Sequence, residues 1–174
     1  MTPPDYMHKN IEIKAVSHNA AAARDYLLKN HAIFKGTDIQ TDTYFNVQYG
    51  RLKLREGNIE NNLIFYDRDN MAGPKQADFI LVQVEDRQGL KESLSRSLGI
   101  KVVVRKEREI YYIDNVKFHI DHVIGLGDFI EIEAGNILAD KTTADLDLQC
   151  RNYMDALGIR EEDLLEGSYS DMLL

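Results

Sequence analysis

The stretch HKNIEIKAV, residues 8–16, alternates apolar and charged side chains and thereby decides how the chain can fold. Ile11 and Ile13 alternate with Glu12 and Lys14. Successive side chains of a β-strand point to opposite faces, so a strand here would bury both isoleucines and place Glu12 and Lys14 together on its other face. The sequence therefore predicts a strand whose second face carries a carboxylate and an amine.

The same period of two recurs along the chain and predicts a protein built mainly of antiparallel strands. Strands are expected at 10–16, 42–47, 51–56, 62–68, 78–85, 101–109, 111–114, 116–123 and 128–134. Helices are expected at about 18–30, 87–98 and 142–157, with Ser17 or Asn19 and Thr142 or Thr143 as candidate N-caps. The predicted fold class is α+β, with the helices packed outside an antiparallel sheet.

Length and composition predict one globular domain over residues 1–174, since 44% of the residues are hydrophobic and 29% are charged. The chain lacks a run of about 18 apolar residues and an apolar leader, so we expect no membrane partner. With Cys150 as its single cysteine, the protein is expected to be cytoplasmic. A net charge of −8 argues against a nucleic-acid partner bound through a broad basic surface.

Charges are sorted by sign among the predicted strand faces. Arg51, Lys53 and Arg55 share one face, Lys106 and Arg108 share another, and Glu131 and Glu133 share a third. For any single strand, a simple solvent-exposed face would explain the alternation equally well. A solvated face tends to mix signs, however. If the sheet curls into a barrel, these faces would line one cavity suited to a polyphosphate together with a hard divalent cation.

Six segments, in order, resemble the CYTH or triphosphate tunnel metalloenzyme family, and within it the class IV adenylyl cyclase-like branch. They are NIEIKA (10–15), DTYF (42–45) with GRLKLRE (50–56), YDRDNMAGPKQADF (66–79), VVVRKERE (102–109), FHIDHVIGLGDFIEIEA (118–134) and SYSDMLL (168–174). This resemblance implies a closed or nearly closed antiparallel β-barrel around a tunnel that binds a triphosphate with Mg²⁺ or Mn²⁺.

The resemblance also implies roles for individual residues. Glu12, Lys14, Glu131 and Glu133 match catalytic positions, and the metal positions are Glu12, Glu131, Glu133 and Asp121. The cations expected to bind phosphate are Lys14, Lys53, Arg55, Arg68, Lys75, Lys106 and Arg108, with Arg51 added from the strand pattern. Asn10 departs from the family, which has a glutamate there, and an amide oxygen is a weaker metal ligand. The number of metal ions, one or two, therefore stays open.

The expected activity is conversion of ATP to cAMP and pyrophosphate. The alternatives are hydrolysis of inorganic triphosphate, thiamine triphosphate or nucleotide triphosphates, and binding of a polyphosphate or nucleotide without turnover. The sequence offers no persuasive Ser–His or Cys–His pair, and His119 is either a proton relay or a polar wall residue. The expected partner is ATP or inorganic triphosphate, and the resemblance also allows a homodimer.

Overall fold

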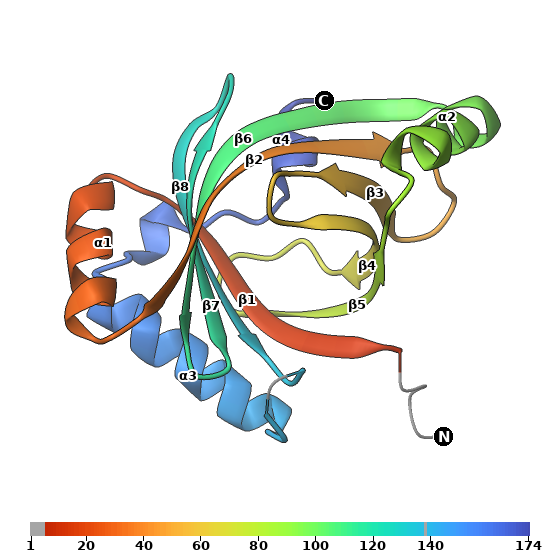
Figure 1. The fold of residues 1–174 in the computed structure, drawn as a ribbon. Coiled ribbons are helices and arrows are strands. Elements are labelled where there is room, and N and C mark those ends of the chain that lie inside the picture. Colours follow the sequence, from red (N-terminus) through yellow and green to blue (C-terminus); the bar gives the residue numbers. More distant parts are fainter. Residues whose placement is uncertain (1–5, 138) are drawn as a thin grey trace.

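The computed structural model describes residues 6–137 and 139–174 and places eight antiparallel strands of this part of the chain in a closed barrel (Figure 1). The strands are β1 (His8–Val16), β2 (Ile33–Phe45), β3 (Arg51–Glu56), β4 (Asn61–Arg68), β5 (Lys75–Gln83), β6 (Ile100–Ile113), β7 (Val116–Val123) and β8 (Gly127–Gly135). Around the barrel they follow the order β1-β5-β4-β3-β2-β6-β7-β8. The predicted closed antiparallel barrel is therefore confirmed.

Two strands depart most from the sequence prediction. β2 begins at Ile33, nine residues before the predicted start at 42, and its pairing with β6 shifts register between Phe34 and Gly36. The irregularity, and the exposed Ile33, Phe34 and Ile39, obscure the alternation in this half of the strand. β6 is continuous across Ile110. The prediction divided the strand there because its inward face changes from charged to apolar residues at this point.

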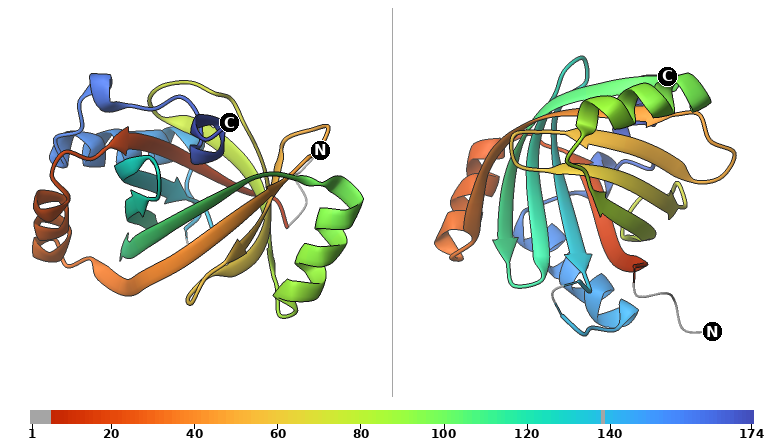
Figure 2. Two further views of the ribbon diagram at one scale, coloured as in Figure 1. Left: turned by 90° about the horizontal axis from the view of Figure 1, so that it is seen from above. Right: turned by 45° about the vertical axis from the view of Figure 1, so that its right-hand side comes forward.

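Helices α1 (Ala20–Lys29) and α3 (Thr143–Ala156) cover one part of the barrel, while α2 (Arg87–Leu98) lies beside β2 and β3 (Figures 1 and 2). Asn19 caps α1 by accepting from the Ala22 N–H at 3.0 Å. Thr142 caps α3 in a reciprocal capping box with Asp145, so one of each pair of candidate caps is confirmed. None of these helices is long and apolar enough to cross a membrane.

The core under α1 and α3 is built from the outward faces of the neighbouring strands. Ile11 and Ile13 of β1 pack there with Leu27 of α1 and with Leu146 and Cys150 of α3. The predicted burial of the two isoleucines is confirmed. Because those faces are covered, Glu12 and Lys14 point into the barrel.

The C-terminal segment covers one end of the barrel. It contains the 3₁₀ turn Glu161–Asp163 and the short helix α4 (Tyr169–Met172), which the sequence pattern does not reveal. The backbone N–H of Leu165 donates to the Lys14 carbonyl at 2.9 Å. Tyr169 is buried in a second apolar cluster with Val104, Val123 and Phe129, at the ends of β7 and β8. Residues distant in sequence therefore complete this end of the barrel.

Adjacent leucines in α1 test how much this packing contributes to stability. Leu27 is fully buried, whereas Leu28 is 53% exposed. We expect Leu27→Ala to lower the free energy of unfolding by about 2–5 kcal/mol, because it leaves a cavity in the core. The matched control Leu28→Ala should change it by less than about 0.5 kcal/mol. Urea unfolding of both variants measures the difference, and equal losses would contradict the packing described here.

Candidate active site inside the barrel

A cavity of about 800 Å³, measured together with its open mouth, lies inside the barrel. Among the described residues, seven Lys and Arg side chains and four Glu side chains line it. They are Lys14, Lys53, Arg55, Arg68, Lys106, Arg108, Lys117, Glu12, Glu60, Glu131 and Glu133. One third of the 21 lysines and arginines of an acidic protein therefore gather around one cavity. Such concentration indicates an anionic ligand.

A single buried carboxylate, Asp42 of β2, organises the cations on one wall. Lys53 donates to its Oδ2 at 3.1 Å, Lys106 at 2.8 Å, and Arg55 binds both carboxylate oxygens at 2.9 Å. Burial opposes ionisation of Asp42, but the charges of Arg55, Lys106 and Lys53 outweigh it and hold its pKa well below the ordinary value. Asp42 is therefore ionised at neutral pH and fixes three cations at the cavity wall.

Glu60, in the turn between β3 and β4, plays a similar part on the neighbouring wall. It binds Arg55 at 2.9 Å and also pairs with Lys117 of β7, so it links opposite sides of the barrel mouth. Burial raises the pKa of Glu60, but the charges of Lys117 and Arg55 outweigh burial and hold the pKa well below the ordinary value. The side chain is thus a second fixed anion among the cations.

An acidic group forms the opposite pole, on β7 and β8. Glu131 lies 2.9 Å from Lys14, 3.2 Å from Arg108 and 3.0 Å from the Nδ1 of His119. Potential ligand atoms of His119, Glu131 and Glu133 all lie within 4.8 Å of one another. Burial, with a contribution from Arg108, lowers the pKa of His119 to about 3, so its ring is neutral. Two carboxylates and a neutral imidazole could therefore hold a divalent cation.

The protonation of Glu133 reflects its burial and the neighbouring carboxylates. Burial and then the neighbouring charge of Glu12, its partner across the β1–β8 ladder, raise its pKa to about 7. Glu12 itself pairs with Arg68. A divalent cation beside Glu133 would relieve this repulsion, so the electrostatics as well as the donor atoms fit a metal ion.

Several polar atoms at the cavity wall have no hydrogen-bond partner among the described residues. They include Nε and Nη2 of Arg68, Oδ1 of Asn10 and Nε2 of His119. Buried polar atoms are normally paired, and unpaired ones need an explanation. Two free guanidinium donors in a cavity rich in cations indicate that an anion completes the set.

Most residues predicted for the site line this cavity, but three do not. Arg51 pairs with Asp171 at 3.1 Å. Lys75 donates to the carbonyls of Leu165 and Glu166 at 2.9 and 3.0 Å, and to Met71 at 3.0 Å. Asp121 binds Arg108 at 2.6 and 2.7 Å and accepts from the Tyr169 hydroxyl at 2.7 Å. The covering C-terminal segment thus engages all three, and their predicted ligand roles stay predictions.

Sequence reasoning missed four residues that shape the site. These are Asp42, Glu60, Lys117 and Tyr169. A signal existed for Asp42 and Lys117, since each shares an inward strand face with other polar residues. Glu60 lies in a turn, and Tyr169, whose ring centroid is 3.6 Å from the Lys14 Nζ, comes from the distant C-terminal segment. Strand alternation reveals neither of these two.

The role of Asp42 can be tested by Asp42→Asn. Losing the charge leaves three buried cations unbalanced, so we expect the free energy of unfolding at neutral pH to fall by about 3–5 kcal/mol. A carboxylate with a lowered pKa contributes fully above its unfolded-state pKa and loses that contribution as the pH falls through its folded-state pKa. The difference between the variant and the wild type should therefore begin to shrink below about pH 4 and vanish only in stronger acid. Denaturant unfolding across pH measures both effects.

Asp128→Asn provides the control. Asp128 forms an exposed pair with His122 at 2.7 Å, so its loss should cost less than about 1 kcal/mol. If Asp42→Asn were no more destabilising than this control, Asp42 would not hold the cationic wall together.

Comparison with known proteins agrees with this geometry. Residues 8–169 match the CYTH domain family. The protein "Putative adenylate cyclase MJ0240" of Methanocaldococcus jannaschii is 32% identical over 101 residues, which cover 56% of this chain and 56% of that protein. The match therefore spans just over half of the relative.

Several solved structures share the fold, and two of them are described here. The PH1012 protein of Pyrococcus horikoshii OT3 superposes with a TM-score of 0.74 at 24% identity, covering 93% of this chain and 98% of that chain. The "Putative adenylyl cyclase HpAC1" of Hippeastrum gives a TM-score of 0.63 at 15% identity, covering 95% and 93%. The family match covers nearly the whole chain, and we conclude that this protein belongs to the CYTH domain family.

Proposed function

We propose that the protein is a metal-dependent enzyme that acts on a triphosphate held inside the barrel. The observation that carries this proposal is the convergence of seven cations, with the two unpartnered donors of Arg68, on one cavity beside an acidic group. A monophosphate would leave most of these cations unused, whereas a chain of phosphates would engage several. Family membership supports the same substrate class.

The cations would bind and orient the phosphate chain. Arg55 and Arg108 are held by the carboxylates of Asp42 and Asp121, so their geometry is fixed before a ligand arrives. Preordered charges that need no reorganisation are the main source of rate enhancement in phosphoryl transfer. Arg68 would bind phosphate oxygens through its free Nε and Nη2.

The acidic group would hold Mg²⁺ or Mn²⁺ through Glu131, Glu133 and His119, with Glu12 next to Glu133. When bound, such an ion supplies positive charge to the phosphate oxygens and stabilises the charge that develops on them. Oxygen ligands suit both ions. The structure describes one such group, which supports one metal position and leaves a second to experiment.

The leading reaction is cyclisation of ATP. The ribose 3′-oxygen would attack the α-phosphorus, the bond to the bridging oxygen would break, and pyrophosphate would leave while the 3′-hydroxyl proton passes to solvent. His119 is buried with its Nδ1 on Glu131, so it belongs to the group that would hold the metal, and we assign it no contact with the attacking hydroxyl. With a pKa of about 3, the ring would not keep the proton.

Hydrolysis is the second candidate, because water could take the place of the ribose hydroxyl in the same cavity. One observation favours it. The Hippeastrum protein with this fold is described as having a dominant triphosphatase activity. A cytoplasmic location and a homodimer stay predictions.

A product assay separates the candidates. The purified protein is incubated with Mg²⁺ or Mn²⁺ and either ATP or inorganic triphosphate, and cAMP, pyrophosphate and orthophosphate are separated. Equal amounts of cAMP and pyrophosphate from ATP would support the cyclase, and orthophosphate from inorganic triphosphate would support the hydrolase. Tight binding without either product would leave a binding module.

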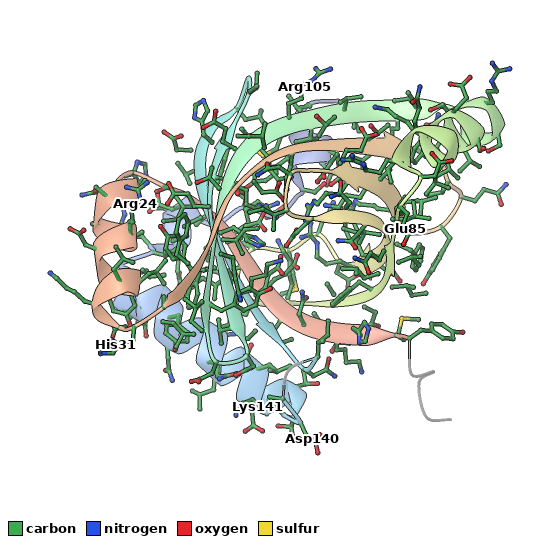
Figure 3. The ribbon with its side chains drawn as sticks, in the orientation of Figure 1. Arg24, His31, Glu85, Arg105, Asp140 and Lys141 are labelled. Atoms are coloured by element: carbon green, nitrogen blue, oxygen red, sulfur yellow. The ribbon has the colours of Figure 1, made fainter. Side chains whose placement is uncertain are left out.

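Glu133→Gln should lower metal-dependent turnover at least about 100-fold, a typical cost of losing an important charge-stabilising group. Glu85→Gln is the matched control, because Glu85 is exposed in the turn between β5 and α2 (Figure 3) and should leave turnover unchanged. Unchanged turnover in Glu133→Gln would exclude this carboxylate from the metal site.

Metal affinity should depend on pH through Glu133. Its pKa of about 7 means that a proton competes with the metal below neutrality. We therefore expect the affinity for Mn²⁺ to rise from about pH 6 to about pH 7 and to level off by about pH 8, by up to tenfold per unit on the rising limb. Titration calorimetry of the wild-type protein measures this. An affinity that stays constant across the range would contradict the role given to Glu133.

A further inference from the structure

Glu60 is an unexpected residue in a cavity proposed to bind an anion, because its carboxylate occupies two of the cations there. It pairs with Arg55 at 2.9 Å and with Lys117 across the mouth of the barrel. All three side chains line the cavity. A site that only gathered positive charge for a polyphosphate would gain nothing from this carboxylate.

Neutralisation of cations alone does not require a carboxylate at this place. Both oxygens of Asp42 already bind Arg55, each at 2.9 Å. The Lys117 side chain is 19% exposed, against 1% for Lys106, so water reaches this lysine and a charged partner is less needed. The effect of Glu60 therefore has to be sought in its position relative to a ligand.

A dedicated set of contacts holds Glu60 in place. Asp38 of β2 is fully buried and accepts hydrogen bonds from the backbone N–H groups of Ile59 and Glu60, both at 2.9 Å. Gln40 joins the two carboxylates, because its Nε2 donates to Asp38 at 2.8 Å and to Glu60 at 3.3 Å. A Cβ at Gly57 would lie 2.4 Å from the Asp38 Oδ1, so only glycine allows this close approach. The turn between β3 and β4 thus keeps the Glu60 carboxylate in the cavity wall.

Glu60 lies at the end of the cavity through which a long ligand would leave. Along β3 the side chains that line the cavity are Lys53 and Arg55, and the next lining residue of the chain is Glu60 in the following turn. The C-terminal segment covers the other end of the barrel, and its Tyr169 lines the cavity while only 3% exposed. A phosphate chain longer than the cavity would therefore have to extend past Glu60.

We infer that Glu60 limits the length of the phosphate chain that the cavity accepts, and that it disfavours chains longer than a triphosphate. A further phosphate would bring negative charge next to a fixed carboxylate, and like charges held together weaken binding. Arg55 and Lys117 are already paired with Glu60 and would offset little of this repulsion. Glu60 is thus a specificity-determining residue. This inference rests on the proposed function, because it takes the phosphate chain to lie on the cations of the cavity.

A comparison of inorganic triphosphate with inorganic tetraphosphate tests the inference. Both are titrated by calorimetry into the wild type, Glu60→Gln and Glu60→Asp, in a buffer containing EDTA so that no metal-dependent turnover occurs. We expect the wild type to bind tetraphosphate no more tightly than triphosphate, although tetraphosphate carries more charge. Glu60→Gln removes the repulsion and should raise the affinity for tetraphosphate relative to triphosphate at least about tenfold. Glu60→Asp keeps the charge and should keep the wild-type ratio.

Glu56→Gln is the matched control. Glu56 pairs with Lys91 of α2 at 3.0 Å and is not among the described residues that line the cavity, so the loss of its charge should leave the ratio unchanged.

The outcomes separate the two proposals. A wild-type protein that binds neither phosphate would overturn the proposed function, and this inference with it. If the wild type binds triphosphate but binds tetraphosphate more tightly, the inference alone is overturned, and this comparison decides the matter even where Glu60→Gln does not fold. A ratio that Glu60→Gln and Glu56→Gln change to the same extent would also overturn the inference alone, because the effect would then come from net charge.

Discussion

The structure of the barrel depends on the neutralisation of cations that a closed sheet forces together. Closure turns one face of every strand inward, and Lys53, Arg55 and Lys106 then lie within hydrogen-bond distance of one carboxylate, Asp42. Unpaired charges in such an interior would be very costly. Three further cations are also neutralised by carboxylates. Lys117 pairs with Glu60, Arg108 with Asp121, and Lys14 with Glu131. The cations of each wall can therefore stay charged inside the barrel because a carboxylate lies beside them.

This neutralisation is incomplete, and the positive charge that is left over explains how the site could bind a ligand. More cations than carboxylates line the cavity among the described residues, and Arg68 keeps two donors free. Burial also lowers the pKa of Lys106 to about 7, although Asp42 opposes this effect, so a bound phosphate would restore its full charge. The fixed anions hold the cations in place, and a bound polyphosphate would supply the negative charge that is still needed to balance them.

Strand alternation in the sequence was enough to predict an antiparallel sheet, the burial of Ile11 and Ile13 and the charged strand faces, because the side-chain period of a strand is fixed. Closure of the sheet into a barrel was predicted from the family resemblance. Alternation could not predict the partners of the charged residues, which depend on register and on long-range contacts. Arg51, Lys75 and Asp121 lie near the barrel end that the C-terminal segment covers, and that segment engages them. Glu60 and Tyr169 were missed for the same reason.

The most direct test of the central claim is a crystal structure of the protein grown with Mg²⁺ and inorganic triphosphate. The account predicts a phosphate chain inside the barrel, with oxygens bonded to Arg68 Nε and Nη2 and to the ammonium groups of Lys53 and Lys106, and a magnesium ion beside Glu133. Triphosphate bound only on the outer surface, with water alone in the cavity, would contradict it.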